Sequence, residues 1–433
     1  MPHLFEKFRN TAFWLLDSFK GRILGDHRKE IRKILTDPCD TDVNQIRQKN
    51  LNRLLGNAVN SVPFYKEYAG YTELSDFPII DKNVVLNNYE AFASVDYKEA
   101  NLYKSSSSGS TGIPFSIYQN KTKRQRNTAD VIHFLEETGG AVGNKLYYIK
   151  LWDYTNAKKW WTRFVQNIFV HNVTNNGEED MAKLISKIED DNSLKTILGY
   201  PSFFEELCNH LDKNKVNPKV KNIKSIITIS EALKQEERDR MTHYFKAPVF
   251  ERYSNQENGI LAQQTKRSDG KYVLNWASFH FEILELDSDK HVQHGGLGRI
   301  VVTDLFNFSM PLIRYDTGDM GIYGKDNNGF AYLSQIYGRR MDAIYDTKGN
   351  IVSPFIFYMV LDFSKVKQFQ FIQKRRTEYL FKLNGRPEDV QEAEIIKYFQ
   401  NYLGEDAIIK FSYVEEIPLL SSGKRKKIVN EYS

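Results

Sequence analysis

The chain has 433 residues, of which 41% are hydrophobic and 13% aromatic, enough to build the cores of two or three domains and too many for a disordered chain. Its 60 Lys and Arg residues exceed its 55 Asp and Glu residues by a net charge of only +5, spread along the chain. Composition and charge therefore give no reason to expect a protein that binds the phosphate backbone of nucleic acids.

Signals for export or membrane insertion are absent from the sequence. No apolar run approaches the ~18 residues that cross a bilayer, and Glu6, Lys7 and Arg9 interrupt the N-terminal apolar stretch that a secretion signal would need. A cytoplasmic protein without a transmembrane segment is expected. Cys39 and Cys208 are too few for a disulfide framework, which predicts two buried, reduced thiols.

The first hundred residues predict helices and connectors. Leu51, Leu54 and Leu55 belong to an apolar pattern with a period near 3.6, and Pro63 interrupts the region. Residues 5–24 carry apolar side chains at mixed helical spacings, which allows two interpretations. We expect this segment to pack on the rest of the protein; the alternative is an amphipathic segment that lies on a membrane surface.

The middle of the chain alternates between strands and helices. The pattern predicts strands over 114–118, 223–229 and 249–253, and helices over 122–137, 202–211 and 234–245. Such alternation is typical of a layered α/β domain. The pattern then changes to alternating segments over 272–276, 279–286 and 299–305, which predict a β-rich subdomain.

The last ninety residues mix short strands with one helix. Strands are predicted over 369–372 and 379–383 and a helix over 387–402, the size of a small α+β domain. The expected fold class is thus α/β, with a large multilayer N-terminal domain over 1–341, its first hundred residues helical, and a small C-terminal domain over 342–433.

Three short motifs carry chemistry. The first is SSSSGSTGIP, residues 105–114, where hydroxyls and glycine-freed backbone amides are suited to wrapping a polyphosphate. It is not a Walker loop, because GxxxxGK[ST] is absent. Taken alone, a flexible linker explains it equally well.

The second motif is RYDTGDMG, residues 314–321. Here Asp319 is expected at a tight turn after a strand over 310–315, and an ionised carboxylate can accept hydrogen bonds from both hydroxyls of a ribose. The alternative is an ordinary Asx turn. The third motif is SSGKRKK, residues 421–427, where Lys424 follows a glycine; its ammonium could neutralise developing phosphate charge or simply belong to a solvated tail.

In their order and separations, these motifs resemble the adenylate-forming superfamily of acyl-CoA synthetases and peptide-synthetase adenylation domains. The resemblance is closest to its phenylacetate-CoA ligase and CapK-like capsular polysaccharide branch, and it covers residues from about 45 to 433. RYSNQENG, residues 252–259, is similar to the family's YGxTE turn, PLIRYDTGD to its ribose motif and YGRRMDAI to its domain junction.

The resemblance implies a role for each matching residue. The phosphate loop would comprise Ser106, Ser107, Ser108, Gly109, Ser110, Thr111 and Gly112. The adenine would lie beside Ser230, Glu231 and Ala232, with Tyr253 against the ring, and Arg252 and Ser254 would also belong to the nucleotide site. Glu257 would hold Mg²⁺, Asp319 the ribose, and Arg339 the ribose or a phosphate. Lys424 would bridge the acid and the α-phosphate, carried by a mobile C-terminal lid that turns about a hinge at Asp342.

Two places depart from the family pattern. Ser254, Asn255 and Gln256 replace its usual Gly-x-Thr, and Ser230 replaces a glycine. Four residues near this turn could line a pocket for the acid, although packing is the favoured role for each: Tyr200, Phe203, Ser230 and Asn255.

The resemblance implies an enzyme that uses ATP and Mg²⁺ to convert a small carboxylic acid into an acyl-AMP. The acyl group would then pass to coenzyme A, to an amine or to a sugar amine of a surface polysaccharide. A non-catalytic nucleotide-binding assembly protein of such a pathway is the alternative. A nucleic-acid binder using residues 424–427 is disfavoured because no aromatic platform accompanies them. The acid, the acceptor and the oligomeric state stay open, a homodimer included.

Overall fold

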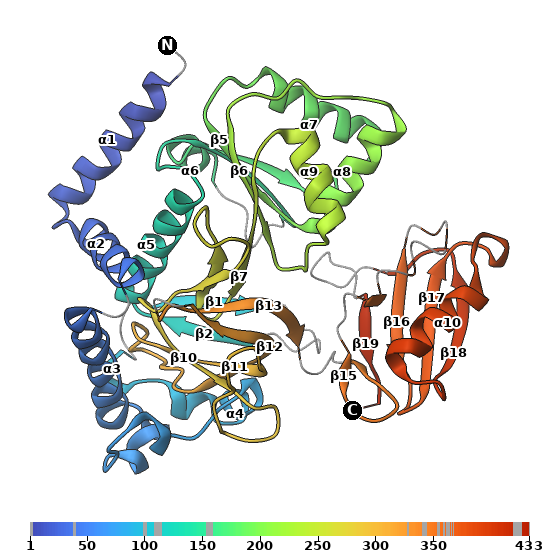
Figure 1. The fold of residues 1–433 in the computed structure, drawn as a ribbon. Helices are drawn as coiled ribbons and strands as arrows, with labels where there is room; N and C mark the ends of the chain where they lie inside the picture. Colours follow the sequence, from blue (N-terminus) through green and yellow to red (C-terminus); the bar gives the residue numbers. More distant parts are fainter. Residues whose placement is uncertain are drawn as a thin grey trace. The chain divides into compact units, whose positions relative to one another are not determined.

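The computed structural model describes residues 3–37, 40–97, 102–107, 115–152, 159–326, 329–339, 344–352, 356–357, 360, 364, 366, 368–418 and 427–432, with the backbone alone at 107, 339 and 351 (Figure 1). The chain divides into two compact units. The larger comprises Met1–Thr317 and Gly321–Ile336; the smaller comprises Gly318–Met320 and Tyr337–Ser433.

The larger unit begins with helices, as its sequence predicts. They are α1 (Leu4–Phe19), α2 (Ile23–Thr36), α3 (Thr41–Ser61) and the short α4 (Lys82–Asn87), with 3₁₀ turns at Pro63–Tyr68, Leu74–Asp76, Tyr89–Phe92 and Val95–Tyr97. Asp40 and Asp81 begin α3 and α4 as N-caps, because each carboxylate accepts a hydrogen bond from a first-turn amide. None of the described helices combines the length and apolarity needed to cross a bilayer.

An eleven-stranded sheet forms the centre of the larger unit, in the order β10-β11-β12-β13-β9-β8-β7-β6-β5-β3-β4. Its parallel part contains β3 (Lys145–Lys150), β4 (Ile168–Asn172), β5 (Lys195–Gly199), β6 (Ile223–Ile229) and β7 (Val249–Asn255). The strands that follow are β8 (Gly259–Gln264), β9 (Tyr272–Leu274), β10 (Phe279–Leu284), β11 (Leu297–Asp304), β12 (Tyr315–Lys325) and β13 (Ala331–Arg339). The pairs β7–β8, β8–β9, β9–β13 and β10–β11 are antiparallel.

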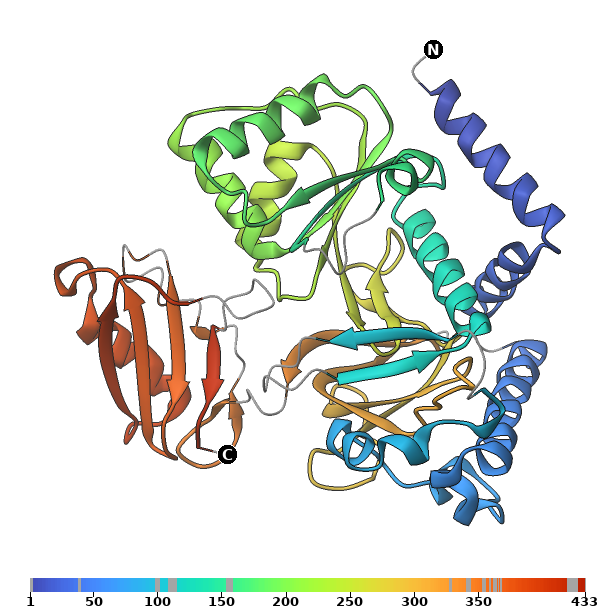
Figure 2. The ribbon, with the colours of Figure 1, turned by 180° about the vertical axis from the view of Figure 1, so that it is seen from behind.

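Helices cover the parallel strands because those strands are apolar on both faces. α7 (Glu178–Asp190), α8 (Pro201–Lys213) and α9 (Gln235–Phe245) lie together beside β5 and β6, and α5 (Lys121–Glu137) contacts β8 (Figures 1 and 2). The short α6 (Trp160–Val165) precedes β4. Cys208 of α8 is a buried free thiol, as expected, and burial raises its pKa to about 12; Cys39 lies outside the described residues.

The smaller unit is a four-stranded sheet in the order β18-β17-β16-β19, with one helix across it. Its elements are β14 (Ile344–Tyr345), β15 (Ile351–Val352), β16 (Phe369–Gln373), β17 (Glu378–Asn384), a 3₁₀ turn at Pro387–Asp389, α10 (Glu392–Leu403), β18 (Ile408–Val414) and β19 (Ile428–Asn430). Phe371, Phe381 and Phe399 pack against one another in its core, with the rings of Phe371 and Phe399 stacked. The expected α/β class, with a small α+β part at the C-terminus, is confirmed.

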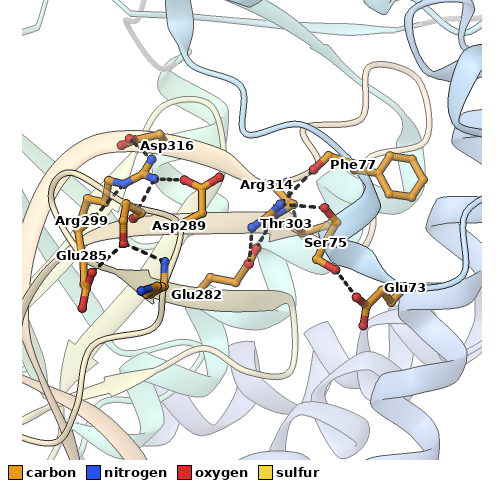
Figure 3. A network of polar contacts seen from close by, with 12 residues as sticks. Glu73, Ser75, Phe77, Glu282, Glu285, Asp289, Arg299, Thr303, Arg314 and Asp316 are labelled. Atoms are coloured by element: carbon orange, nitrogen blue, oxygen red, sulfur yellow. Dashed lines mark hydrogen bonds and ion pairs between the residues drawn. The ribbon is translucent and has the colours of Figure 1, made fainter.

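A polar network holds the start of β12 (Figure 3). Arg314 makes a bidentate ion pair with Glu282, at 2.9 Å from Nη2 and 3.1 Å from Nε, and donates from Nη1 to the carbonyl oxygen of Phe77 at 2.9 Å. Both charged side chains are 6% exposed. Next to them, Arg299 bridges Asp289 and Asp316. Buried charges paired in this way fix the path of the chain into β12.

Buried histidines predict that stability falls in mild acid. Burial lowers the pKa of His280 and of His133 from 6.5 to about 4. Between about pH 6.5 and pH 4 the unfolded chain binds protons that the native protein does not. Each histidine therefore lowers the free energy of unfolding by about 1.4 kcal/mol per pH unit of acidification. The His280→Gln variant should therefore lose less stability than the parent between pH 7 and pH 5 in urea unfolding. Parallel pH profiles would contradict this.

Candidate functional site

The serine motif begins inside a β-hairpin. β1 (Tyr103–Ser107) pairs antiparallel with β2 (Phe115–Gln119), from Tyr103 opposite Gln119 to Ser107 opposite Phe115. The expectation that residues 105–107 belong to a loop is wrong, because they form strand pairs; Ser106 Oγ lies 2.7 Å from Ser116 Oγ across the hairpin. The rest of the expected phosphate loop, Ser108, Gly109, Ser110, Thr111 and Gly112, lies outside the described residues.

Two hydrogen bonds fasten this hairpin to the turn between β7 and β8. Ser105 Oγ donates to the carbonyl oxygen of Gln256 at 2.7 Å, and Gln119 Nε2 donates to the carbonyl oxygen of Glu257 at 3.0 Å. The bonds start from the two opposite strands of the hairpin. The segment expected to bind phosphate is thus anchored on the turn that carries Glu257, the residue expected to hold Mg²⁺.

The turn itself is closed by Asn255, whose Oδ1 accepts a hydrogen bond from the Asn258 amide at 2.8 Å. Gly259 follows with φ +100°, a conformation that favours glycine. A Cβ at Gly259 would lie 2.9 Å from Asn127 Oδ1, so the side chain of Asn127 on α5 would have to shift to accommodate it. Asn255, which departs from the family pattern, therefore has a structural role in shaping this turn.

Tyr253 connects β7 to the strand that carries Asp319. Its hydroxyl donates to Thr317 Oγ1 at 3.2 Å, and Thr317 in turn donates to the carbonyl oxygen of Ile300 at 2.9 Å. Asp319 follows two residues later in β12. Neither Thr317 nor Gln119 was among the expected site residues, since each is a common polar residue whose partner lies tens of positions away.

The expected surroundings of Asp319 need correction. Residues 310–314 are irregular rather than a strand, and Asp319 lies within β12 rather than at a tight turn. Gly318, immediately before it, has φ +77°, which locally distorts the strand. The Thr-Gly-Asp sequence resembles a turn locally, but its place in the large sheet makes it a strand.

The turn after β6 begins with a strained serine. Ser230 has φ +69°, in the left-handed region where a glycine is favoured, which accounts for the glycine that the family has there. Glu231 follows, and its Oε2 accepts a hydrogen bond from the Ser202 amide at 2.9 Å in the first turn of α8. Glu231 thus caps α8, while Ala232 is exposed.

The conformation of Ser230 gives a prediction about stability. Ser230→Val should be less stable than Ser230→Gly by about 1 to 2 kcal/mol, because a β-branched side chain clashes in the left-handed region whereas glycine does not. Urea unfolding of the two variants measures the difference. Equal stabilities would mean that residue 230 has another backbone conformation.

Of the remaining expected residues, some pack and some lie outside the described part of the chain. Arg252 donates from Nε to Gln263 Oε1 at 2.6 Å, and burial lowers its pKa to about 10, which leaves it charged at neutral pH. Ser254 pairs with Ile260 in the β7–β8 ladder. Phe203 is buried against His171, which favours packing over substrate contact. Arg339 ends β13 and is described by its backbone alone; Asp342 and Lys424 lie outside the described residues.

Within the described ranges, no three His, Cys, Asp or Glu side chains gather as a metal-ligand cluster. The arrangement that remains is a hairpin, a turn with one carboxylate and a strand with another, joined by hydrogen bonds between residues more than sixty positions apart. The carboxylates of such an arrangement can accept hydrogen bonds from hydroxyl groups or bind a cation that arrives with a ligand.

Comparison with known proteins gives concordant results. Residues 344–431 match the CapK C-terminal domain. The chain is 22% identical over 452 residues to Protein CapK of Staphylococcus aureus, with 96% of both chains covered. It is 23% identical over 317 residues to the phenylacetate-coenzyme A ligase of Pseudomonas putida, with 66% of this chain and 69% of that protein covered.

A solved structure has the same fold over almost the whole chain. It is a 2-hydroxyisobutyryl-CoA ligase in the postadenylation state, in complex with R3-HIB-AMP, at TM-score 0.72 and 17% identity over 90% of each chain. Together, these comparisons support the assignment of the chain to an adenylate-forming, CapK-like family.

Proposed function

We propose that this protein is an ATP-dependent ligase that activates a carboxylic acid as an acyl-adenylate, releases pyrophosphate and then transfers the acyl group. The observation that carries the proposal is the hydrogen-bonded connection of three segments that lie far apart in the sequence: the serine hairpin, the Glu257 turn and β12. The hairpin that leads into the serine motif bonds to the Glu257 turn, and Tyr253 of the strand before that turn bonds to β12, the strand of Asp319. The relatives named above support the same activity.

Each motif would handle one part of ATP. Residues 106–112 would donate hydrogen bonds to the phosphates, Tyr253 would lie against the adenine, and Asp319 would accept both ribose hydroxyls. Arg252 would add positive charge, since its guanidinium stays protonated. Glu231 fits an indirect role, because its carboxylate is engaged at the start of α8 and positions the turn beside Ser230.

The residues present fit a Mg²⁺ ion that arrives with the nucleotide. Mg²⁺ in nucleotide enzymes typically has one or two protein carboxylates, with phosphates and waters as its other ligands. The turn supplies one carboxylate, Glu257, and the described residues hold no larger acidic cluster. When bound, the ion would neutralise phosphate charge.

Activation is an in-line displacement. A carboxylate oxygen of the acid forms a bond to the α-phosphorus, the bond from that phosphorus to the bridging oxygen breaks, and pyrophosphate leaves with the electron pair. Catalysis is mainly alignment and charge neutralisation. Lys424 would place its ammonium between the acid and the α-phosphate, and a hinge at Asp342, the expected boundary at 341/342, would let the C-terminal lid withdraw it afterwards.

The second half of the reaction transfers the acyl group. We include coenzyme A as acceptor because a phenylacetate-coenzyme A ligase is among the relatives. An amine, such as a sugar amine of a surface polysaccharide, is the alternative acceptor, which the sequence resemblance implies. A cytoplasmic location, where ATP is available, is part of this proposal. Incubation with ATP, a panel of acids and either coenzyme A or amines distinguishes the two acceptors. A thioester product supports coenzyme A, and an amide product supports an amine. If neither product forms, the proposed acyl transfer is contradicted.

Asp319→Ala should weaken ATP binding. Loss of the acceptor for both ribose hydroxyls is expected to cost about 2 to 4 kcal/mol of binding free energy. Isothermal titration with ATP measures it. Asp287→Ala is the matched control, because it removes the same charge from an exposed position near β10. Equal ATP affinity in the two variants would remove Asp319 from the nucleotide site.

A further inference from the structure

The first helix exposes its apolar side. Six bulky side chains of α1 are between 53% and 87% exposed: Leu4, Phe5, Phe8, Leu15, Leu16 and Phe19. At about 100° per residue they fall within an arc of roughly 120°, a single stripe along the helix. The expectation that this segment packs its apolar residues on the rest of the protein is therefore wrong for these six.

The helix is held in this orientation by its polar side. Glu6 and Asp17 are buried, and Asp17 accepts hydrogen bonds from the amides of Leu24 at 3.0 Å and Gly25 at 2.8 Å. Asn10 Nδ2 donates to the carbonyl oxygen of Val142 at 2.9 Å. The neighbouring Gly143 lies so close that a Cβ there would be 2.4 Å from the carbonyl oxygen of Glu6. These contacts face the protein, so the apolar stripe faces outward.

A second helix extends the exposed apolar surface. In α6, Trp160, Trp161, Phe164 and Val165 are between 52% and 77% exposed. Arg9 of α1 lies over the Phe164 ring, with its Cζ 5.7 Å from the ring centroid, so the two helices are neighbours. We call these ten apolar residues the α1–α6 surface. Exposed apolar groups gathered in this way mark an interaction site.

The exposed charges on the two segments that carry this surface have one sign. In the described stretches 3–22 and 159–166, no acidic side chain is exposed, since the two acidic residues of α1 are the buried ones. Six exposed or half-buried cations accompany the surface: Lys7, Arg9, Lys20 and Arg22 in and directly after α1, and Lys159 and Arg163 at α6. A partner for this surface must therefore offer an apolar region that these side chains can enter, together with negative charge.

We propose that the α1–α6 surface binds the interface of an anionic lipid membrane. Phe and Leu side chains would enter the acyl boundary, tryptophans suit the headgroup level, and the flanking cations would contact anionic headgroups. A second copy of this chain fits less well, because a two-fold pairing of the surface would bring like charges together. The proposal does not rest on the ligase activity.

Flotation of the full chain with lipid vesicles tests the proposal. The protein should float with phosphatidylcholine vesicles that contain about 30% phosphatidylglycerol, and bind at least roughly tenfold more weakly to phosphatidylcholine alone or in about 0.5 M salt. The Phe8→Ser/Phe19→Ser variant should bind the anionic vesicles at least roughly tenfold more weakly than the parent, because two apolar anchors are lost. Lys7→Gln/Lys20→Gln should weaken binding by roughly fivefold per cation.

Matched controls separate the surface from general hydrophobicity. Val131 of α5 and Tyr402 of α10 are 45% and 46% exposed on other helices, so Val131→Ser/Tyr402→Ser should bind vesicles as the parent does. All variants should keep the parent's unfolding temperature, since each replaced side chain is exposed. Equal flotation of Phe8→Ser/Phe19→Ser and the parent would overturn the proposal. The proposal would also be overturned if the parent did not bind anionic vesicles. It would likewise be overturned if light scattering showed that the parent is a dimer and the Phe8→Ser/Phe19→Ser variant a monomer.

Discussion

In the Lys424→Ala variant, acid-dependent exchange of pyrophosphate into ATP is expected to fall at least roughly a hundredfold. The ammonium would be needed only where negative charge gathers between the acid and the α-phosphate, and loss of one such group typically costs 10²- to 10³-fold, which is about 3 to 4 kcal/mol. Folding and AMP binding should be kept, because this ammonium is expected to act only in the activation step. The measurement is exchange of labelled pyrophosphate.

Lys426→Ala is the control for that experiment, because it removes the same charge two residues along the same motif. It should retain exchange close to that of the parent. If both variants keep the parent's rate, Lys424 has no part in activation. If both lose it equally, the basic segment acts through its total charge and not through one positioned ammonium.

Arg314→Ala is expected to lower the free energy of unfolding by about 3 to 5 kcal/mol. The substitution leaves the Glu282 carboxylate, 6% exposed, buried without its bidentate partner, and frees the carbonyl oxygens of Ser75 and Phe77 that the guanidinium also binds. Urea unfolding measures the loss. Because Arg314 leads directly into β12, ATP affinity should fall with stability in this variant.

A double substitution distinguishes the lost ion pair from lost packing. Arg314→Met/Glu282→Leu removes both charges and should recover most of the stability, because no unpaired charge is left buried. Lys213→Ala is the exposed counterpart: its partner Glu178 is 68% exposed, and the variant should match the parent. A double variant no more stable than Arg314→Ala would contradict the assignment of the loss to Glu282.

The elements that the sequence predicts correctly are those in which the pattern of apolar residues indicates which residues are buried. The apolar run over 223–229 coincides with β6, because a parallel strand covered on both faces is apolar throughout. The helix predicted over 202–211 lies within α8, whose Phe203, Leu207 and Leu211 recur at helical spacing and are buried. The strand with Asp319 was missed, since its Asp-Thr-Gly-Asp run has no apolar alternation and takes its conformation from the neighbouring strands of the sheet. For the first helix, the prediction that its apolar residues pack on the protein is wrong for the six exposed ones. Mixed helical spacings do not tell which side of a helix faces the protein, and the side that is buried here carries Glu6 and Asp17.

For the candidate site, the sequence could supply residues but not their contacts. Short motifs that resemble those of the adenylate-forming superfamily identify Tyr253, Glu257 and Asp319 from the sequence. The hydrogen bonds that join their segments run from Ser105 to Gln256 and from Tyr253 to Thr317, across separations that no local pattern encodes. Ser230 was noted as a departure, and its positive φ now explains why a glycine is the usual residue there.

Acid-dependent exchange of labelled pyrophosphate into ATP by the unaltered protein tests the central claim most directly. With a panel of aromatic, fatty and amino acids, the account predicts that label enters ATP only when a suitable acid is present, since formation of an acyl-adenylate is reversible before the acyl group moves on. ATP binding without exchange for any acid would contradict a ligase and favour a non-catalytic nucleotide-binding protein.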